Sequence, residues 1–297
     1  MRKAFLLGAG LGTRLQPLTN TLPKPLLPFQ NRPLITHAMD HCLAAGITDF
    51  AINTHHLAEA WQEAFPDGTY RGANITFFHE PVLLETGGGI KNIADWIGYD
   101  PVLVYNGDIV TDLPIDRLIT RHMASNNSAT LAIQDHGPAL HIATDGSQIT
   151  DIRGMVDGQP GTHQFTGVYC IDPEVLDLIP ADEKISIIPA FLDLIKKKEL
   201  GAYLIKGGPR WLDLGTRETY LAAHALTPAE ISPDATVESG ADVQNSWVGS
   251  GCHIESGARV ANSILWPGTK VLGDAELTNC IVHSNSPASG VHRDADL

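Results

Sequence analysis

The chain has 297 residues, enough for one or two domains with sizeable hydrophobic cores. Its 20 lysine and arginine residues against 34 aspartate and glutamate residues give a formal net charge of −14, which argues against a nucleic-acid partner because phosphate backbones require basic surface. The four cysteines lack C-x-x-C spacing and the first apolar run is short, so we expect reduced thiols, no membrane partner and a cytoplasmic location.

Short apolar runs alternate with helix-like segments over most of the chain. A periodic stretch at Pro33–Ala45 ends at Gly46, as a helix would. This alternation predicts an α/β fold, a Rossmann-like and mostly parallel sheet flanked by helices, with ligands beyond the carboxyl ends of the strands. The runs that fit buried strands are Lys3–Leu7, Asp49–Asn53, Ile75–Phe78, Val102–Tyr105, Ala129–Ile133 and Gly167–Ile171.

The pattern changes after Ala225. An aliphatic residue recurs at every sixth position between small and turn-forming residues, with one five-residue step before Val248 and a loss of strict periodicity at Ala261–Trp266. Such a repeat predicts a parallel β-helix. We therefore expect a sheet domain over residues 1–226 and a short β-helix over residues 227–297. The aliphatic positions are Ile231, Val237, Val243, Val248, Ile254, Val260, Val271 and Leu277.

Three spaced glycines, Gly8, Gly10 and Gly12, directly follow the first predicted strand. A turn of this kind brings backbone N–H groups close to an anion such as a phosphate. The spacing fits neither a dinucleotide fingerprint nor a P-loop, because both need a glycine at position 13, where the chain has Thr13. Neither NAD binding nor a P-loop ATPase is therefore favoured.

Five segments together resemble the sugar-1-phosphate nucleotidylyltransferases. They are GAGLGTRLQPLT followed by PKPLLP, ETGGGIKN at 85–92, NGD at 106–108, FTGVY at 165–169 and WLDLGT at 211–216. The trailing repeats are similar to the left-handed parallel β-helix of several family members. The resemblance covers nearly the whole chain. It implies an enzyme that transfers a nucleoside monophosphate from a nucleoside triphosphate to a sugar 1-phosphate, releasing pyrophosphate.

Two cationic residues are the predicted catalytic residues. The reaction brings two polyanions together against their repulsion, so charge neutralisation and positioning are the main tasks. Arg14 offers a fork of donors suited to the departing pyrophosphate, and Lys24, held between two prolines, is a point charge suited to the α-phosphate and the incoming sugar phosphate. No general base is required, because a sugar phosphate is already ionised.

Two aspartates are the predicted ligands of one Mg²⁺. Asp108 follows an apolar run and so lies at the carboxyl end of a strand, and Asp213 resembles the second metal ligand of the family. By resemblance, the base is read near Glu80 and the segment Leu84–Thr86, where a glycine run enters a helix. The complete set of predicted substrate-binding residues is Gly8, Ala9, Gly10, Gly12, Thr13, Glu80, Glu85, Thr86, Gly88, Asn106 and Gly167.

The substrates are less well defined than the reaction. The segment LLETGGGI is most similar to the N-acetylmuramate-1-phosphate uridylyltransferases, which favours UTP with N-acetylmuramate 1-phosphate or a similar sugar, whereas guanylyl enzymes tend to have L-G-T-A-G. A β-helix is more typical of mannose- and glucose-specific relatives. The E-K-P motif that many glucose-1-phosphate enzymes have before the T-G-x-Y stretch is missing from this chain. Mannose-1-phosphate guanylyltransferase and glucose-1-phosphate nucleotidylyltransferase activities, with GTP, dTTP or ATP, stay open as alternatives.

Two further interpretations concern the chain as a whole. A non-catalytic relative that binds nucleotide sugars or acts as a scaffold is the alternative of another class, but retention of Arg14, Lys24, Asp108 and Asp213 favours an enzyme. The β-helix is interpreted as an assembly or regulatory module, with a homo-oligomer as one form of assembly, because it is short for an acyltransferase. The 13 histidines lack the spacing of metal ligands.

Overall fold

The computed structural model describes residues 1–284 and 286–297. Their backbone contacts form two compact units, each made of two separate stretches of sequence. The first unit is Met1–Leu11 with Ile35–Trp211, and the second is Gly12–Leu34 with Leu212–Leu297. The segment that follows the first glycines therefore belongs to the same unit as the C-terminal repeats. The predicted division into residues 1–226 and 227–297 stays a prediction.

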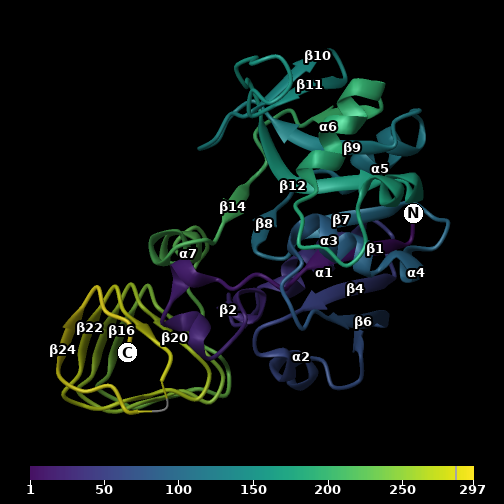
Figure 1. Ribbon diagram of the computed structural model, residues 1–297. Coiled ribbons are helices and arrows are strands. Elements are labelled where there is room, and N and C mark those ends of the chain that lie inside the picture. Colours follow the sequence, from purple (N-terminus) through teal and green to yellow (C-terminus); the bar gives the residue numbers. More distant parts are fainter. Residues whose placement is uncertain (285) are drawn as a thin grey trace. The chain divides into compact units, whose positions relative to one another are not determined.

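A ten-stranded sheet lies at the centre of the first unit (Figure 1). In sheet order its strands are β10 (Ile142–Asp145), β11 (Gln148–Ile152), β13 (Leu200–Leu204), β9 (Ala129–Gln134), β12 (Gln164–Ile171), β7 (Val102–Asn106), β1 (Lys3–Leu7), β4 (Asp49–Thr54), β6 (Ala73–His79) and β5 (Thr69–Tyr70). Strands β7, β1, β4 and β6 are parallel neighbours, whereas β12 runs antiparallel to β7 and β9. The predicted mostly parallel α/β sheet is thereby confirmed.

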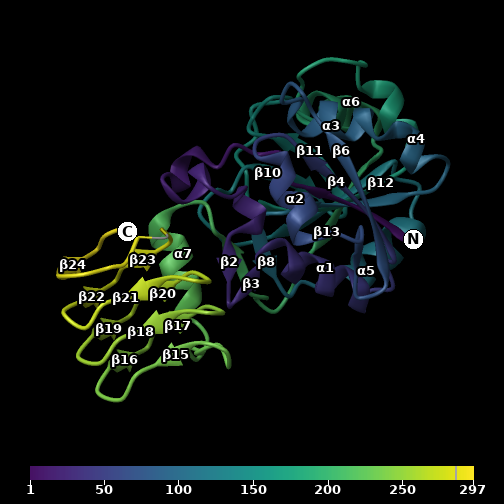
Figure 2. The ribbon, with the colours of Figure 1, turned by 90° about the horizontal axis from the view of Figure 1, so that it is seen from below.

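Helices cover both faces of this sheet. They are α1 (Ile35–Ala44), α2 (Ala58–Ala64), α3 (Glu85–Asn92), α4 (Ala94–Ile97), α5 (Ile115–Met123) and α6 (Ile188–Lys197). Figure 2 shows α3, α4 and α6 on one side of the sheet and α1 and α5 on the other. Because both faces are covered, central strands are apolar along their length, and every residue of β9 is buried. No helix in the two described ranges is long and apolar enough to cross a bilayer.

The predicted elements of the first unit are present. The six predicted strands correspond to β1, β4, β6, β7, β9 and β12, with bounds within three residues of those expected. The predicted helix at Pro33–Ala45 is α1, and Gly46, whose φ is 85°, follows its end as expected for a helix stop. Continuous apolar runs therefore located the buried strands correctly.

Strand β1 marks the point at which the strand order reverses. The chain moves from β1 to β4 and β6 on one side and then crosses to β7 on the other side of β1. Gly8 follows β1, Asn106 ends β7 at the same edge, and the N–H of Gly107 donates to the carbonyl of Leu7 at 3.1 Å. In open α/β sheets ligands bind at such a reversal. The glycine turn and the Asn106–Asp108 segment therefore leave the sheet from neighbouring strands at this edge.

Apart from the C-terminal repeats, the second unit contains short turns, a hairpin and a helix. These are η1 (Thr13–Leu15), η2 (Leu18–Asn20), η3 (Lys24–Leu26), β2 (Pro28–Phe29), β3 (Arg32–Pro33) and α7 (Arg217–His224). The hairpin turns through Gln30 and Asn31, which both have a positive φ. The N–H of Gln30 donates to Nε2 of His224 at 3.3 Å, and Nδ2 of Asn31 donates to the carbonyl of Val248 at 3.2 Å. C-terminal residues thus hold the N-terminal hairpin.

The C-terminal repeats form the predicted left-handed parallel β-helix, whose coils run from green to yellow in Figure 1. Paired strands are offset by 17 residues, as in the pairs Thr236–His253 and Ile264–Ile281. The offset shortens to 15 in the last coil. The strands are β15 (Thr236–Val237), β16 (Asp242–Gln244), β17 (Trp247–Val248), β18 (His253–Ile254), β19 (Arg259–Ala261), β20 (Ile264–Leu265), β21 (Lys270–Val271), β22 (Glu276–Thr278), β23 (Ile281–Val282) and β24 (Val291–Arg293).

The loss of periodicity expected at Ala261–Trp266 is a regular feature of the coil. A 17-residue coil has two sides of six residues and one of five, so the buried aliphatic residue after Val260 is Leu265, five positions on. The same short step leads from Leu277 to Val282, and both of these residues are buried. Counting strictly in sixes therefore loses register once in every coil.

Of the predicted repeat positions, two are exposed and a third, Val243, is partly buried. Ile231 is 43% exposed and Val237 is 37% exposed, although both pair with the next coil. They belong to the first coil, which has a neighbouring coil on one side. The repeat pattern identifies the strands, but burial also requires a coil on either side.

Polar side chains connect successive coils at one corner. Asn245 and Asn262 occupy equivalent corners 17 residues apart, each with a positive φ, which asparagine adopts more readily than most residues. Beside them, Oγ of Ser246 accepts from the N–H of Ser263 at 3.0 Å, and Oγ of Ser263 accepts from the N–H of Cys280 at 3.0 Å. Each hydroxyl therefore satisfies a backbone donor of the following coil.

We predict that Leu265→Ala lowers the free energy of unfolding by about 2–5 kcal/mol, because it leaves a cavity among buried aliphatic side chains. Val237→Ala is the matched control at the exposed end and should change it by less than about 0.5 kcal/mol. Urea unfolding followed by circular dichroism measures both. Equal effects of the two substitutions would contradict the assigned coil register.

Candidate active site

Lys24 and Asp213 form an ion pair within the second unit. Nζ of Lys24 lies 3.6 Å from Oδ1 of Asp213, and the side chain of Lys24 is 8% exposed whereas that of Asp213 is 41% exposed. Lys24 begins η3 between Pro23 and Pro25, and all three residues are buried. Lysine is almost never buried unless it is paired, because the ammonium group loses its hydration. The ion pair with Asp213 therefore offsets part of the cost of burying Lys24.

Arg14 approaches the same carboxylate. Gly215 follows Asp213, and a Cβ added at Gly215 would lie 2.9 Å from Nη2 of Arg14 and 2.9 Å from Oδ1 of Asp213. The absence of a side chain at Gly215 thus gives the guanidinium and the carboxylate their space. Partly exposed ion pairs contribute about 0–1 kcal/mol to stability, so folding alone gives little reason for this arrangement. The structure brings Arg14 and Lys24 together around the carboxylate of Asp213.

Asn106 and Gly167 are brought together in the first unit. Gly167 has a φ of 81°, and a Cβ added there would lie 2.6 Å from Nδ2 of Asn106. The register between β12 and β9 shifts between Phe165 and Tyr169, at this position. Asp108 is half-buried in the turn between β7 and β8 (Ile109–Thr111). The predicted NGD segment therefore has its place at the carboxyl end of β7, as expected.

His41 links the end of β7 to the segment that follows β8. Nε2 of His41 donates to the carbonyl of Leu113 at 2.7 Å, so Nδ1 is the acceptor for the hydroxyl of Tyr105 at 3.2 Å. Burial lowers the pKa of His41, although its hydrogen bond to Leu113 opposes this effect. Burial also raises the pKa of Tyr105 well above its ordinary value. A neutral histidine and a neutral tyrosine thus connect the end of β7 to the segment after β8.

The glycine turn has a packed side and an open side. A Cβ at Gly8 would lie 2.7 Å from the carbonyl oxygen of Asn53 and 2.8 Å from the ring of Trp61, so Gly8 is required for packing. A Cβ at Gly10 would meet no atom of the described chain within 4 Å. Gly12 has a φ of 62°, a conformation that glycine adopts without strain. Gly10 is therefore the glycine whose exposed backbone is best placed to approach a ligand.

The predicted base-reading segment differs from expectation in one respect. Helix α3 begins at Glu85, whose φ is 60°, and the glycines Gly87–Gly89 lie inside the helix and are buried. A Cβ at Gly88 would lie 2.4 Å from the carbonyl oxygen of Glu183. Thr86 is also engaged, because its Oγ1 accepts from the N–H of Ile187 at 3.0 Å. The glycine run therefore lets α3 pack closely against the chain before α6.

Sequence reasoning missed the partner of Glu80. The Glu80 side chain is fully buried, and its carboxylate accepts from Nδ2 of Asn53 at 2.7 Å and from the N–H of Leu84 at 2.9 Å. Oδ1 of Asn53 in turn accepts from the N–H of Gly8 at 2.7 Å. Asn53 ends the apolar run of β4, and Glu80 follows the end of β6. Because these two strands are parallel neighbours, this placement is the signal in the sequence that could have paired the two residues. The predicted contact of Glu80 with the base stays untested.

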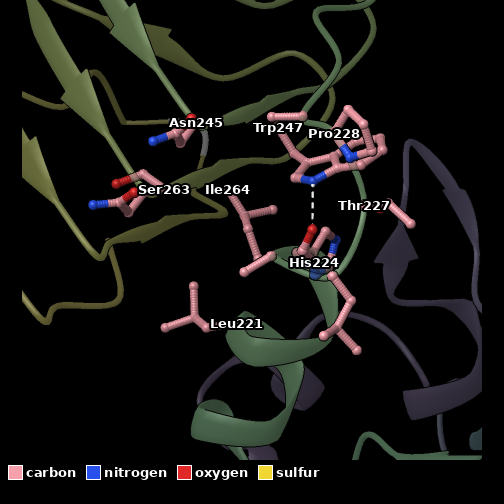
Figure 3. Close-up of a pocket in the computed structure, with 12 residues that line it drawn as sticks. Leu221, His224, Thr227, Pro228, Asn245, Trp247, Ser263 and Ile264 are labelled. Atoms are coloured by element: carbon pink, nitrogen blue, oxygen red, sulfur yellow. Dashed lines mark hydrogen bonds between the residues drawn. The ribbon is translucent and has the colours of Figure 1, made fainter.

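Two cavities lie elsewhere. The one in Figure 3, of about 460 Å³, lies in the second unit between α7 and the β-helix, with His224, Trp247 and Asn245 among its lining residues. Nε1 of Trp247 donates to the carbonyl of His224 at 3.1 Å. This hydrogen bond holds the end of α7 against the β-helix. The other, of about 480 Å³, includes Asp49 at the amino end of β4. Neither is lined by a predicted site residue.

Comparison with known proteins agrees with the arrangement of these motifs. Residues 3–230 match the family model described as nucleotidyl transferase, which is more than half of the chain. The chain belongs to the nucleotidyl transferase family. Residues 222–289 match a second model, described as GlmU-like, C-terminal hexapeptide. The two matches meet where the sequence pattern changes.

Similar members of the family use different substrates. Mannose-1-phosphate guanylyltransferase of Mycobacterium tuberculosis is 29% identical over 235 residues, covering 77% of this chain and 66% of that protein. N-acetylmuramate alpha-1-phosphate uridylyltransferase of Neisseria meningitidis is 34% identical over 232 residues, covering 76% of this chain and 99% of that protein. The chain thus spans slightly less than two thirds of the mycobacterial protein. The enzyme class predicted from the sequence is confirmed at the level of the family.

A solved structure supports the fold. UDP-glucose pyrophosphorylase from Acinetobacter baumannii matches with a TM-score of 0.67 and 18% identity, covering 77% of this chain and 93% of that one. At this identity the likeness concerns the fold of the nucleotidyl transferase family alone.

We predict opposite behaviour for two glycines of the same turn. Gly8→Ala should lower the free energy of unfolding by about 1–3 kcal/mol, because the added methyl group meets the backbone of β4. Gly10→Ala should leave it unchanged within about 0.5 kcal/mol, because the methyl group enters open space. Chemical denaturation measures both. A destabilised Gly10→Ala variant would show that this side of the turn is packed.

Proposed function

We propose that this chain transfers a nucleoside monophosphate from a nucleoside triphosphate to a sugar 1-phosphate. The observation that carries the proposal is the gathering of Arg14 and Lys24 around the carboxylate of Asp213 in a chain of the nucleotidyl transferase family. An oxygen of the sugar phosphate attacks the α-phosphorus, the bond from the α-phosphorus to the bridging oxygen breaks, and pyrophosphate leaves. No proton needs to be removed from this nucleophile.

The cationic side chains divide the negative charge between them. Lys24, a buried point charge held by two prolines, neutralises the α-phosphate and the incoming sugar phosphate, and Arg14, which is exposed, binds the departing pyrophosphate through its fork of donors. The backbone of Gly8, Ala9, Gly10, Gly12 and Thr13 provides N–H groups for the triphosphate. Because the reacting phosphates repel each other, most of the catalytic effect comes from holding them in place.

Two carboxylates are the proposed ligands of one Mg²⁺. Asp108 and Asp213 are carboxylates, the ligands that Mg²⁺ prefers beside phosphate oxygens, and the Asp213 side chain is 41% exposed and so accessible to an ion. We propose that these two residues hold the ion. When bound, Mg²⁺ offsets the charge of the phosphates. Lys24 places its ammonium group 3.6 Å from the Asp213 carboxylate.

UTP is the proposed nucleotide, with N-acetylmuramate 1-phosphate or a similar sugar. The LLETGGGI segment and the 34% identity to the neisserial uridylyltransferase support this choice. We propose that the base is bound at Leu84–Thr86, which includes Glu85, with Gly88 two residues further on, and that the sugar is bound near Asn106 and Gly167. Mannose 1-phosphate with GTP is the alternative that the mycobacterial relative supports.

The proposal extends to the organisation of the protein. Residues 1–226 are the proposed catalytic domain and residues 227–297 a β-helix for assembly into a homo-oligomer. A cytoplasmic location is supported by the four cysteines, Cys42, Cys170, Cys252 and Cys280, which are all buried free thiols.

The substrate proposal is tested by an assay of each nucleoside triphosphate with each candidate sugar 1-phosphate, scoring pyrophosphate. We expect turnover with UTP and N-acetylmuramate 1-phosphate. Turnover confined to GTP and mannose 1-phosphate would replace that choice. If no pair releases pyrophosphate in the presence of Mg²⁺, the proposed function is wrong.

The role of the buried lysine is tested with Lys24→Gln. Removing one charge that stabilises the transition state should lower kcat by about 100- to 1,000-fold. The matched control is Lys197→Gln in α6, an exposed lysine, which should keep the activity of the unaltered enzyme. Thermal unfolding of both variants shows whether they are folded. Unchanged kcat in folded Lys24→Gln would remove Lys24 from the mechanism.

A further inference from the structure

One chain of buried hydrogen bonds links the glycine turn to the segment before α3. It runs from the N–H of Gly8 to Oδ1 of Asn53, from Nδ2 of Asn53 to Oε1 of Glu80, and from the N–H of Leu84 to Oε2 of Glu80. Asn53 is 3% exposed and Glu80 is 0% exposed. The chain therefore joins the ends of β1, β4 and β6 to the turn that leads into α3.

The direction of these hydrogen bonds is fixed at both ends. A backbone N–H only donates, so the atom of Asn53 that faces Gly8 must be its oxygen, and its NH₂ group must face Glu80. Glu80 then receives a donor from Asn53 and a second donor from Leu84. Both oxygens of Glu80 act as acceptors, which an ionised carboxylate provides and a glutamine does not.

Close packing reinforces this geometry. A Cβ added at Gly89 would lie 2.9 Å from Oε1 of Glu80 and 3.0 Å from Nδ2 of Asn53. Helix α3 thus packs directly against the Asn53–Glu80 pair. A glycine is needed at position 89 because a larger side chain would meet the pair. A buried polar network of this kind is stable only when every donor and acceptor is matched.

We propose that Asn53 and Glu80 are positioning residues that share one buried negative charge and hold two nucleotide-binding segments in register. Through Gly8 the pair orients the start of the phosphate turn, and through Leu84 it orients the segment proposed to bind the base. Glu80 then acts on the nucleotide through the Leu84 backbone rather than by touching the base. This inference rests on the proposed nucleotide site.

The decisive experiment moves the charge from one residue to the other. In Glu80→Gln the amide nitrogen faces the Asn53 NH₂ group, and in Asn53→Asp two carboxylates face each other. Each single variant leaves buried groups mismatched, so we expect the Kd for UTP, measured by calorimetry, to rise about tenfold or more. The double variant N53D/E80Q restores every hydrogen bond, because Asp accepts from Gly8 and from Gln, and Gln accepts from Leu84.

The double variant should therefore bind UTP within about threefold of the unaltered protein, and the Gly8 and Leu84 amides should regain their protection from hydrogen exchange. The matched control is Asn74 and Asp49, an exposed amide–carboxylate hydrogen bond of 3.0 Å on the same two strands at the opposite edge. Its single variants N74D and D49N should leave UTP binding unchanged.

The outcomes separate this inference from the proposed function. If the double variant regains both the Kd for UTP and the KM for the triphosphate, the shared charge is supported, even if the single variants do not fold. A double variant that folds but binds UTP no better than the singles overturns it. Because binding is measured without turnover, UTP binding without pyrophosphate release would reject the proposed function and leave the positioning role standing.

Discussion

The structure depends on a local concentration of positive charge in an acidic protein. With a net charge of −14, the chain has no general attraction for phosphates, and the cationic groups that meet them must be fixed individually. Lys24 is fixed by burial between prolines and by Asp213, and Arg14 is given room by Gly215. Both cations lie in the segment Gly12–Leu34, which is held by C-terminal residues of the second unit. The β-helix and α7 thus contribute to the surroundings of the proposed catalytic residues.

Much of the fold follows from short-range patterns. Strands buried on both faces have continuous apolar sequences, which is why Val102–Asn106 and Ala129–Gln134 were predicted from the sequence within a residue. The alternation of strands and helices predicted the mostly parallel sheet, but the order of its strands comes from contacts between distant residues. The glycine turn and the NGD segment were located correctly because each comes directly after such a strand.

The remaining features depend on contacts between distant residues. Asn53 and Glu80 are 27 positions apart, and their pairing requires the parallel register of β4 and β6. The close packing of the α3 glycines against residues 183–186 joins segments almost 100 positions apart, which the spacing of the glycines does not reveal. The five-residue side of the β-helix coil is visible only once neighbouring coils are paired. The spacing of residues along the chain therefore predicts which residues take part in the proposed chemistry. The residues that position them are found only from the packing of the fold.

The central claim, attack of a sugar phosphate on an α-phosphorus beside Lys24 and Arg14, is tested most directly by following oxygen. The sugar 1-phosphate that supports turnover is prepared with ¹⁸O in its phosphate, and the products are analysed by ³¹P NMR. The account predicts that all the label stays in the nucleotide sugar, with one labelled oxygen bridging its two phosphorus atoms, and that the pyrophosphate is unlabelled. An unlabelled bridging oxygen would show that the sugar phosphate is not the nucleophile at the α-phosphorus and would contradict it.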